Sequence, residues 1–346
     1  MSTPVTETPL EEHGGGDPRS SRRLRQAREL GILLALVLLV VITTLVNPGF
    51  LSSQSIDDLL LGATLLTILA VGQTMVIVTR CVDLSVGSIL GLSAFAVGTL
   101  FVSFPSLPIV LVALAGVLVG AACGLVNGTL VATARVPALV VTLGTLYVFR
   151  GIDHWWASGT QINAADMPEE FLGIGRTSLL GIPLPAVIAV AVVLGAGWYL
   201  GSYRSGRELY AIGSEPQAAR LSGIPVDRRV LGAFIANGAL AGLAGVLYAA
   251  RFGTLDATVG TGLELEVVAA AVVGGVAIFG GSGTVYGAAL GAVLLTTIGS
   301  ALPILQVNAF WQQAVVGLLI LVAIGMDRLL AVRTARRLRG GESSGA

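Results

Sequence analysis

Residues 183–250 read PLPAVIAVAVVLGAGWYL (183–200), GSYRSGRELYAIGSEPQAARLSGIPVDRR (201–229) and VLGAFIANGALAGLAGVLYAA (230–250). The first and last stretches are uncharged and close to the ~20 residues that a helix needs to cross a bilayer. The middle stretch carries five arginines, and each would cost about 2.5–3.5 kcal/mol at the bilayer centre. The sequence therefore predicts two transmembrane helices joined by a loop in water.

The composition of the whole chain indicates the same class. Of the 346 residues, 54% are hydrophobic and 12% are charged, whereas a soluble domain has about 25% charged residues. Glycine is abundant and aromatic residues are scarce, which fits closely packed helices better than a barrel with aromatic girdles. We expect an all-α polytopic membrane protein. The net charge of +0 gives no electrostatic footprint for nucleic acid.

Apolar segments recur along the chain, and we expect about ten transmembrane helices. Several segments are shorter than the ~20 residues of a straight crossing. We expect the fifth and eighth segments to be broken or half-length helices buried among others. The ten segments cover residues 30–46, 59–78, 86–104, 108–131, 136–149, 183–200, 230–250, 267–279, 285–302 and 310–326.

Charge at the two ends predicts the orientation. Arginines cluster just before the first segment and just after the last, and positive charge accumulates on the cytoplasmic side. We expect a disordered cytoplasmic tail over residues 1–29, a membrane domain over 30–330 and a basic cytoplasmic tail over 331–346. An even number of spans also places the 201–229 loop in the cytoplasm.

The 201–229 loop contains a predicted docking helix. Residues 215–223 read EPQAARLSG, in which an acid and a proline open a helical turn and a glycine closes it. We expect a short helix there that seats against another protein.

Two tight turns join neighbouring apolar segments, VDLSVGS (82–88) and FGGSGTVYG (279–287). Their similarity indicates a duplicated helix–turn–helix element, with both turns near the cytoplasmic surface. In the first turn Asp83 or Ser85 is expected to cap the following helix. The alternative is that Asp83 binds a coupling ion or proton, because an acid at membrane depth is a functional candidate.

A few small or polar residues complete the set of candidate pathway or turn positions. Polar side chains inside the spans can bond across helices or line a route for a neutral, hydroxyl-rich solute, and both readings stay open. The glycines at 116, 120, 124 and 128, and again at 283, 287 and 291, indicate close helix packing. Besides Asp83 and Ser85, the candidates are Gln73, Gly87, Asn127, Thr142, Asn237, Gly281 and Ser282.

Some chemistry is excluded. All 20 basic residues are arginine, so a Walker A loop is absent and any ATP hydrolysis must come from a partner. The string GGSG (280–283) matches a short signature of intramembrane serine proteases. Its base would have to be His154, which we expect near the opposite membrane face from Ser282, too far for activation. We predict that the chain is not an enzyme.

Five strings in order now support a family resemblance. They are NPGFL (47–51), VDLSVGS (82–88), VPALVVTLGT (136–145), GRELYAIGSEPQAARLSGI (206–224) and VGGVAIFGGSGTVYG (273–287). Together they resemble the ribose-type permeases of bacterial ABC sugar importers across residues 31–330. The carboxy-terminal third is somewhat more similar to the rhamnose and autoinducer-2 subgroup.

The resemblance implies a permease subunit that moves a sugar or related polyhydroxylated solute across the bacterial inner membrane. It implies three partners besides membrane lipid: a cytoplasmic ABC ATPase that holds ATP and Mg, an extracytoplasmic sugar-binding protein, and a second permease subunit, identical or homologous. The chain itself is expected to bind no cofactor. The rival interpretation from another class is an ion-coupled secondary transporter that uses Asp83.

The resemblance also assigns a role to the docking helix. In that family the equivalent helix is the coupling helix, which seats in a groove of the ATPase. The residues expected to make this contact are Glu215, Pro216, Ala218, Ala219, Arg220 and Gly223, with Arg207, Arg228 and Arg229 placed to pair with acids of the partner.

Overall fold

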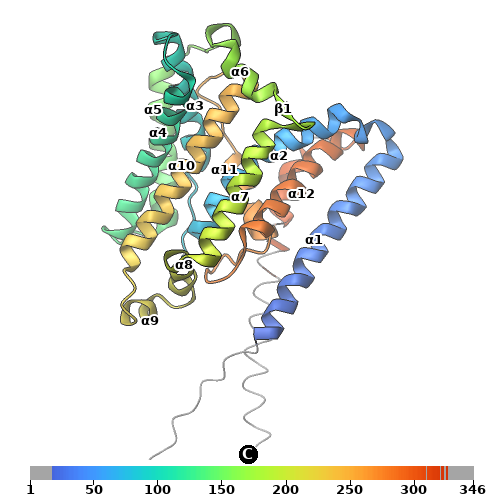
Figure 1. Ribbon diagram of the computed structural model, residues 1–346. Coiled ribbons are helices and arrows are strands. Elements are labelled where there is room, and N and C mark those ends of the chain that lie inside the picture. The colour runs from blue at the N-terminus through green and yellow to red at the C-terminus, as the bar shows by residue number, and fades with distance from the viewer. Residues whose placement is uncertain (1–17, 309, 320, 323–324, 326–346) are drawn as a thin grey trace, which may run out of the picture.

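The chain is a bundle of helices with one short β-hairpin (Figure 1). A computed structural model describes residues 18–308, 310–319, 321, 322 and 325. The elements are α1 (Pro18–Val46), η1 (Pro48–Leu51), α2 (Ser53–Ile77), α3 (Val86–Ser103), α4 (Ile109–Ala132), α5 (Ala138–Ala157), η2 (Ala164–Asp166), α6 (Glu169–Arg176), β1 (Ser178–Leu179), β2 (Ile182–Pro183), α7 (Leu184–Ser202), α8 (Arg204–Ser214), α9 (Pro216–Leu221), α10 (Val226–Phe252), α11 (Leu263–Val273) and α12 (Val285–Ile304).

The helical membrane class is confirmed. Among the described residues, six helices are long and apolar enough to cross a membrane: α2, α3, α4, α7, α10 and α12. Each of the other predicted segments is helical as well, within α1, α5, α11 and the described residues after 310. These four are shorter, less apolar or only partly described.

Two predicted boundaries need correction. The fifth segment is not broken, because α5 runs without interruption from Ala138 to Ala157 and carries Arg150 and Asp153 into the bundle. The first helix begins at Pro18 rather than near residue 30, since proline suits the first helical position and the arginines and alanine that follow are good helix formers. Of the predicted tails over 1–29 and 331–346, residues 1–17 and the whole of 331–346 lie outside the described residues.

The half-length eighth helix is confirmed. The helix α11 has 11 residues, about 16 Å of rise, which is half a bilayer. It ends at Gly274, and the backbone then continues through residues 275–284 with positive φ at Gly275, Gly280, Gly281 and Gly283. Thr284 begins α12 by accepting a hydrogen bond from the Gly287 N–H at 3.0 Å.

Glycine decides the closest contact in the bundle, between α4 and α10. A Cβ placed on Gly120 would strike the Gly238 carbonyl oxygen, and one placed on Gly238 would strike the Gly120 carbonyl oxygen. Gly124 approaches the backbone at Phe234 in the same way. The predicted packing role of the glycine repeat is confirmed, since small residues are what let helix backbones approach.

The bundle has two distinct ends (Figure 1). The helices α8 and α9 lie at one end, which we call the α9 side. The helix α6 and the β1–β2 hairpin lie at the other, which we call the α6 side. The helix α10 begins next to α9 and ends where Leu255 pairs with Ile162, beside α6, so it spans the distance between the two sides.

Candidate functional site

The segment between α2 and α3 is the centre of a buried polar cluster. Asp83 has no exposed surface. One carboxylate oxygen, Oδ1, accepts hydrogen bonds from the N–H of Ser85 at 2.8 Å and from its hydroxyl at 2.7 Å. The other, Oδ2, accepts from Asn237 Nδ2 of α10 at 2.9 Å. The aspartate therefore fixes both its own turn and a helix 154 residues further along the chain.

The polar side chains singled out inside the spans all converge on this segment. Asn127 Nδ2 of α4 donates to Ser85 Oγ at 2.7 Å, and Thr142 Oγ1 of α5 donates to the Val82 carbonyl oxygen at 3.1 Å. With its amide oriented to suit its neighbours, Gln73 of α2 donates to the Asp83 carbonyl oxygen at 3.2 Å and accepts from the Asp83 N–H at 3.1 Å. We call residues 82–85, together with the side chains of Gln73, Asn127, Thr142 and Asn237, the Asp83 cluster.

The location of the turn corrects one expectation. The turn was expected near the surface, yet Asp83, Ser85 and the four converging side chains are all buried. The reason is that residues 78–85 return into the bundle before α3 begins, and hydrogen bonds from four helices stabilise the returning backbone. Ser85 occupies the N-cap position of α3 but makes no capping bond with its side chain.

The contacts of the Asp83 cluster bear on two questions that the sequence left open: whether Asp83 binds an ion, and whether the polar side chains line a solute route. Each hydrogen bond to the carboxylate comes from an N–H or O–H donor, while the amide oxygens of Asn127 and Asn237 are buried without a hydrogen-bond partner among the described residues. The contacts of Gln73, Asn127, Thr142 and Asn237 join helices, and none of the four is exposed to a solute route. The arrangement anchors the α2–α3 turn to the bundle.

The second predicted turn, between α11 and α12, lies beside the end of α2 on the α9 side. The Gly281 N–H donates to the Val78 carbonyl oxygen at 3.0 Å, which joins the α11–α12 turn to the end of α2. Ser282 is exposed, and its carbonyl oxygen accepts from the Ala277 N–H at 3.0 Å. Gly87 lies elsewhere, at the start of α3, where a Cβ would strike the Gly260 carbonyl oxygen.

The predicted docking helix is present as α9. Glu215 is its N-cap, and the side-chain Oε1 accepts from the Gln217 N–H at 3.4 Å, with Pro216 in the first turn. Gly223 has φ +77° and ends the helix, since glycine adopts this conformation without strain. Glu215 and Gly223 thus have clear roles within the chain as the two ends of α9.

The two alanines of α9 face opposite ways. Ala219 is buried against the chain's own core, whereas Ala218 is exposed. The expectation that both alanines contact a partner does not fit Ala219, because neighbouring helical residues point about 100° apart and Ala219 is the one turned toward the core. The apolar residue that α9 does expose is Leu221, with 90% of its surface accessible.

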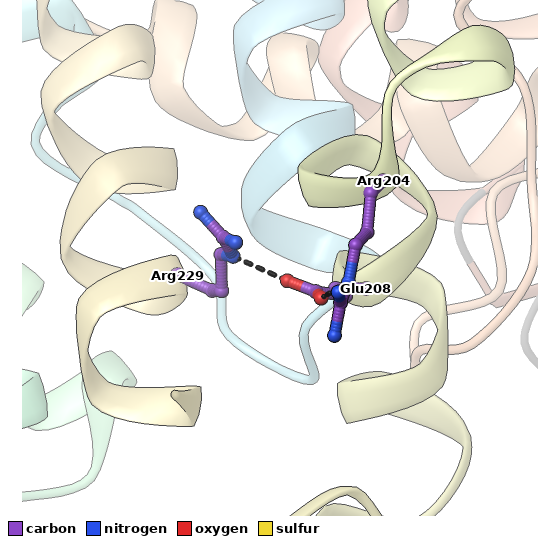
Figure 2. Close-up of polar contacts among 3 residues, drawn as sticks. All are labelled: Arg204, Glu208 and Arg229. Carbon is purple, nitrogen blue, oxygen red and sulfur yellow. Dashed lines mark hydrogen bonds and ion pairs between the residues drawn. The ribbon is translucent and has the colours of Figure 1, made fainter. Parts of the chain in front are cut away.

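Four of the five loop arginines are engaged within the chain: Arg204, Arg207, Arg220 and Arg229. Arg207 Nη1 donates to the Ser202 carbonyl oxygen at 2.8 Å, and Arg220 Nη2 lies 2.6 Å from Asp227 Oδ1. Figure 2 shows the other two: Arg229 Nε lies 2.5 Å from Glu208 Oε2, while Arg204 Nε lies 2.8 Å from Oε1. The hydrogen bond from Arg229 lowers the pKa of Glu208. The pairing of loop arginines with acids on a partner stays a prediction, since Arg220 keeps 49% of its side chain exposed beside Asp227.

The Arg204–Glu208–Arg229 cluster positions α8. Glu208 lies on α8 and Arg229 on the first turns of α10, so the ion pair connects the two helices across the α9 loop (Figure 2). It holds the start of α10 against α8 while α9 projects beyond them.

A second buried charge, Asp153, lies beyond the fifth predicted segment, which ended at residue 149. It lies on α5 without exposed surface, and neither carboxylate oxygen has a hydrogen-bond partner among the described residues. Arg150, one turn earlier, donates to the carbonyl oxygens of Ala257 at 3.0 Å and Val259 at 2.5 Å. The polar pair at spacing i, i+3 within a continuous helix was the signal that could have found it.

His154 and Ser282 lie at opposite ends of the bundle, as expected, so they cannot act together as the base and nucleophile of a protease. His154 lies in the last turn of α5, which leads to the Ile162–Leu255 bridge on the α6 side. Ser282 follows Gly281, which contacts Val78 and Ser214 on the α9 side. The 27 residues of α10, about 40 Å of helix, run between these two sides.

Comparison with known proteins gives a consistent match. A family model described as "Branched-chain amino acid transport system / permease component" matches residues 55–324. The chain is 38% identical over 316 residues to "Autoinducer 2 import system permease protein LsrC" of Escherichia coli (strain K12 / DH10B), covering 91% of each chain. It is 38% identical over 320 residues to the protein of the same description in Enterobacter sp. (strain 638), covering 92% of each. These relatives are transport permeases, not enzymes.

Proposed function

Because the chain belongs to the transport permease family whose model it matches over residues 55–324, we propose that it is the membrane-spanning subunit of an ATP-driven importer. It is a multi-pass protein of the inner membrane and not an enzyme. The observation that carries the proposal is α9, a short capped helix that projects from the apolar bundle and exposes Leu221. A projecting helix of this kind fits a groove on a partner.

The partner that fits is an ABC ATPase. The chain has no lysine for a P-loop of its own, so ATP and its Mg would be held by the other protein. The α9 side is then cytoplasmic, and we expect both termini to be cytoplasmic as well. A solute-binding protein would dock on the α6 side, and a second permease subunit, identical or homologous, would complete the pathway.

The relatives point to a class of solute. Proteins named as autoinducer-2 import permeases share 37–38% of their residues with this chain over nearly its full length. We take a sugar or related polyhydroxylated molecule as the solute, with autoinducer-2 as the first candidate. A neutral hydroxyl-rich solute also fits a bundle in which the charges of Asp83 and Arg150 are already engaged with amide and backbone groups.

Reconstituted transport tests this proposal. The chain would be placed in proteoliposomes with the ABC ATPase and the binding protein encoded beside its gene, and uptake of labelled autoinducer-2, ribose and leucine would be followed. We expect uptake of a hydroxylated solute that requires ATP and survives a protonophore. Uptake that persists without ATP and stops when the proton gradient collapses would identify the ion-coupled alternative instead.

Leu221→Glu is expected to weaken association with the ATPase by at least about tenfold, since a charge would replace an apolar anchor in a desolvated groove, at a typical cost of about 2 kcal/mol or more. The measurement is ATPase co-purification with the tagged chain in detergent. Leu180→Glu is the matched control, because Leu180 is 97% exposed but lies in the β1–β2 turn on the α6 side. Equal ATPase recovery with both variants would remove α9 as the docking helix.

A further inference from the structure

A single arginine links α8, which leads into α9, to the end of α2. Arg80 follows α2 and extends its guanidinium to the end of α8, where Nε donates to the Gly213 carbonyl oxygen and Nη2 to the Ser214 carbonyl oxygen, each at 2.5 Å. These carbonyls belong to the last turn of α8, which has no helical N–H left to bond. The planar guanidinium presents two N–H donors to both carbonyls in a fixed geometry, whereas a lysine ammonium is a compact point charge on a flexible stem and does not hold the two carbonyls in that geometry.

The α11–α12 turn joins the same contact. The Gly281 N–H bonds to the Val78 carbonyl oxygen, and Tyr210 Oη of α8 donates to the Gly283 carbonyl oxygen at 3.1 Å. A Cβ on Gly213 would strike both the Val78 carbonyl oxygen and the Gly281 nitrogen. We call these three touching backbone segments, 78–80, 213–214 and 280–283, the Arg80 junction.

The backbone at Arg80 has an unusual conformation. Its φ is +66°, a region that a residue with a side chain rarely occupies and that costs about 1–2 kcal/mol. Gly280 packs directly on it, since a Cβ there would strike the Arg80 Cγ. The surrounding contacts hold Arg80 in this conformation, which aims its side chain at α8.

The junction is continuous with the Asp83 cluster. Only two residues separate Arg80 from Asp83, and both the α4 amide of Asn127 and the α10 amide of Asn237 hold the 83–85 turn. Thr142 of α5 holds the carbonyl of Val82. A displacement of the end of α8 therefore acts on a backbone segment that is bonded to three further helices.

We propose that Arg80 is the positioning residue that transmits movement of α9 to the transmembrane helices. This inference rests on the proposed function, in which α9 seats on the ATPase. When the ATPase moves α9, Arg80 draws the 78–85 segment with the end of α8, and the Asp83 cluster passes the shift to α4, α5 and α10. Arg80 contacts no solute and no nucleotide in this role.

A merely structural role makes a different prediction. If Arg80 only stabilised the end of α8, its loss would lower the melting temperature or the recovery of ATPase, and the surviving complex would transport normally. A transmitting role leaves assembly intact and changes the solute moved per ATP hydrolysed. That ratio is therefore the decisive measurement.

The experiment uses the complete importer in proteoliposomes with labelled autoinducer-2 as the probe. Arg80→Gln and Arg80→Lys are expected to keep ATPase recovery and basal ATP hydrolysis, and to lower solute uptake per ATP by about tenfold, within the range of a coupling free energy between two sites. Arg135→Gln is the control. Arg135 also has positive φ, and among the described residues its side chain makes no hydrogen bond or ion pair.

Three results would overturn the inference. Unchanged uptake per ATP in Arg80→Gln would remove any transmitting role, and normal coupling in Arg80→Lys would show that the two-carbonyl contact is unnecessary. Loss of assembly in both variants would make Arg80 a structural cap. Failure of the proposed function itself is distinguishable, because the unmodified chain would then show no ATP-dependent uptake of any solute tested.

Discussion

Gly238→Leu is expected to abolish the accumulation of folded protein. The position lies where α10 and α4 are in backbone contact, so the first added carbon meets the Gly120 carbonyl oxygen and the Gly124 backbone. A backbone cannot rotate away as a side chain can, and the two helices would have to separate. Overpacking in a rigid core costs about 1–3 kcal/mol and sometimes more, and here it would also break the bonds that Asn127 and Asn237 make from these helices.

Gly232→Leu is the matched control for this change. It places the same side chain on the same helix, at a glycine with nothing within 4 Å of the added carbon. The measurement is the fraction of each variant that elutes as a single species in mild detergent, together with its melting temperature. Similar yields and melting temperatures for the two variants would show that the α4–α10 contact does not depend on glycine.

Asp83→Ala is expected to produce the second largest loss of stability. It removes the acceptor for the Ser85 N–H and hydroxyl and for Asn237 Nδ2, leaving buried donors unpaired. Each buried group left without a partner costs about 1–3 kcal/mol, so the sum is a large part of the free energy of unfolding of an ordinary protein. Thermal unfolding in detergent measures it.

Asp227→Ala provides the comparison for Asp83→Ala. Asp227 is paired with Arg220, but both side chains are about half exposed, and exposed ion pairs contribute about 0–1 kcal/mol. We therefore expect its melting temperature to stay close to that of the unmodified chain. If Asp83→Ala unfolds at the same temperature as Asp227→Ala, the Asp83 cluster does not anchor the α2–α3 turn.

The local elements were largely predictable from the sequence because their signals are local. Acid, proline and glycine at 215, 216 and 223 predict where α9 begins and ends. In the structure Glu215 caps the helix through its side chain, Pro216 lies in its first turn and Gly223 follows its end with positive φ. The glycine repeat of α4 predicts a close helix contact, although not that α10 makes it. The predicted end of α5 was wrong. The apolar run ends before Arg150, the first charged residue, but the helix continues to Ala157.

The sequence could not predict that the polar side chains inside the spans meet at one place. Gln73, Asn127, Thr142 and Asn237 lie on four helices, and no spacing along the chain shows that they meet at one turn. The expected contact by Ala219 failed for a similar reason: a six-residue helix has no periodicity from which its buried face can be read. Arg80 was overlooked because a lone arginine beside a conspicuous motif carries no pattern of its own.

The sequence by itself determined the membrane class, the family and the existence of a projecting capped helix, since hydropathy, composition and end signals depend on residues near one another. Only the tertiary structure decided which side chains meet. It shows that Asp83 is buried and holds the α2–α3 turn, that Ala219 is buried while Leu221 is exposed, and that Arg80 bonds to the end of α8. The physical reason is that hydrogen bonds between distant helices depend on how the helices pack, which the order of residues along the chain does not show.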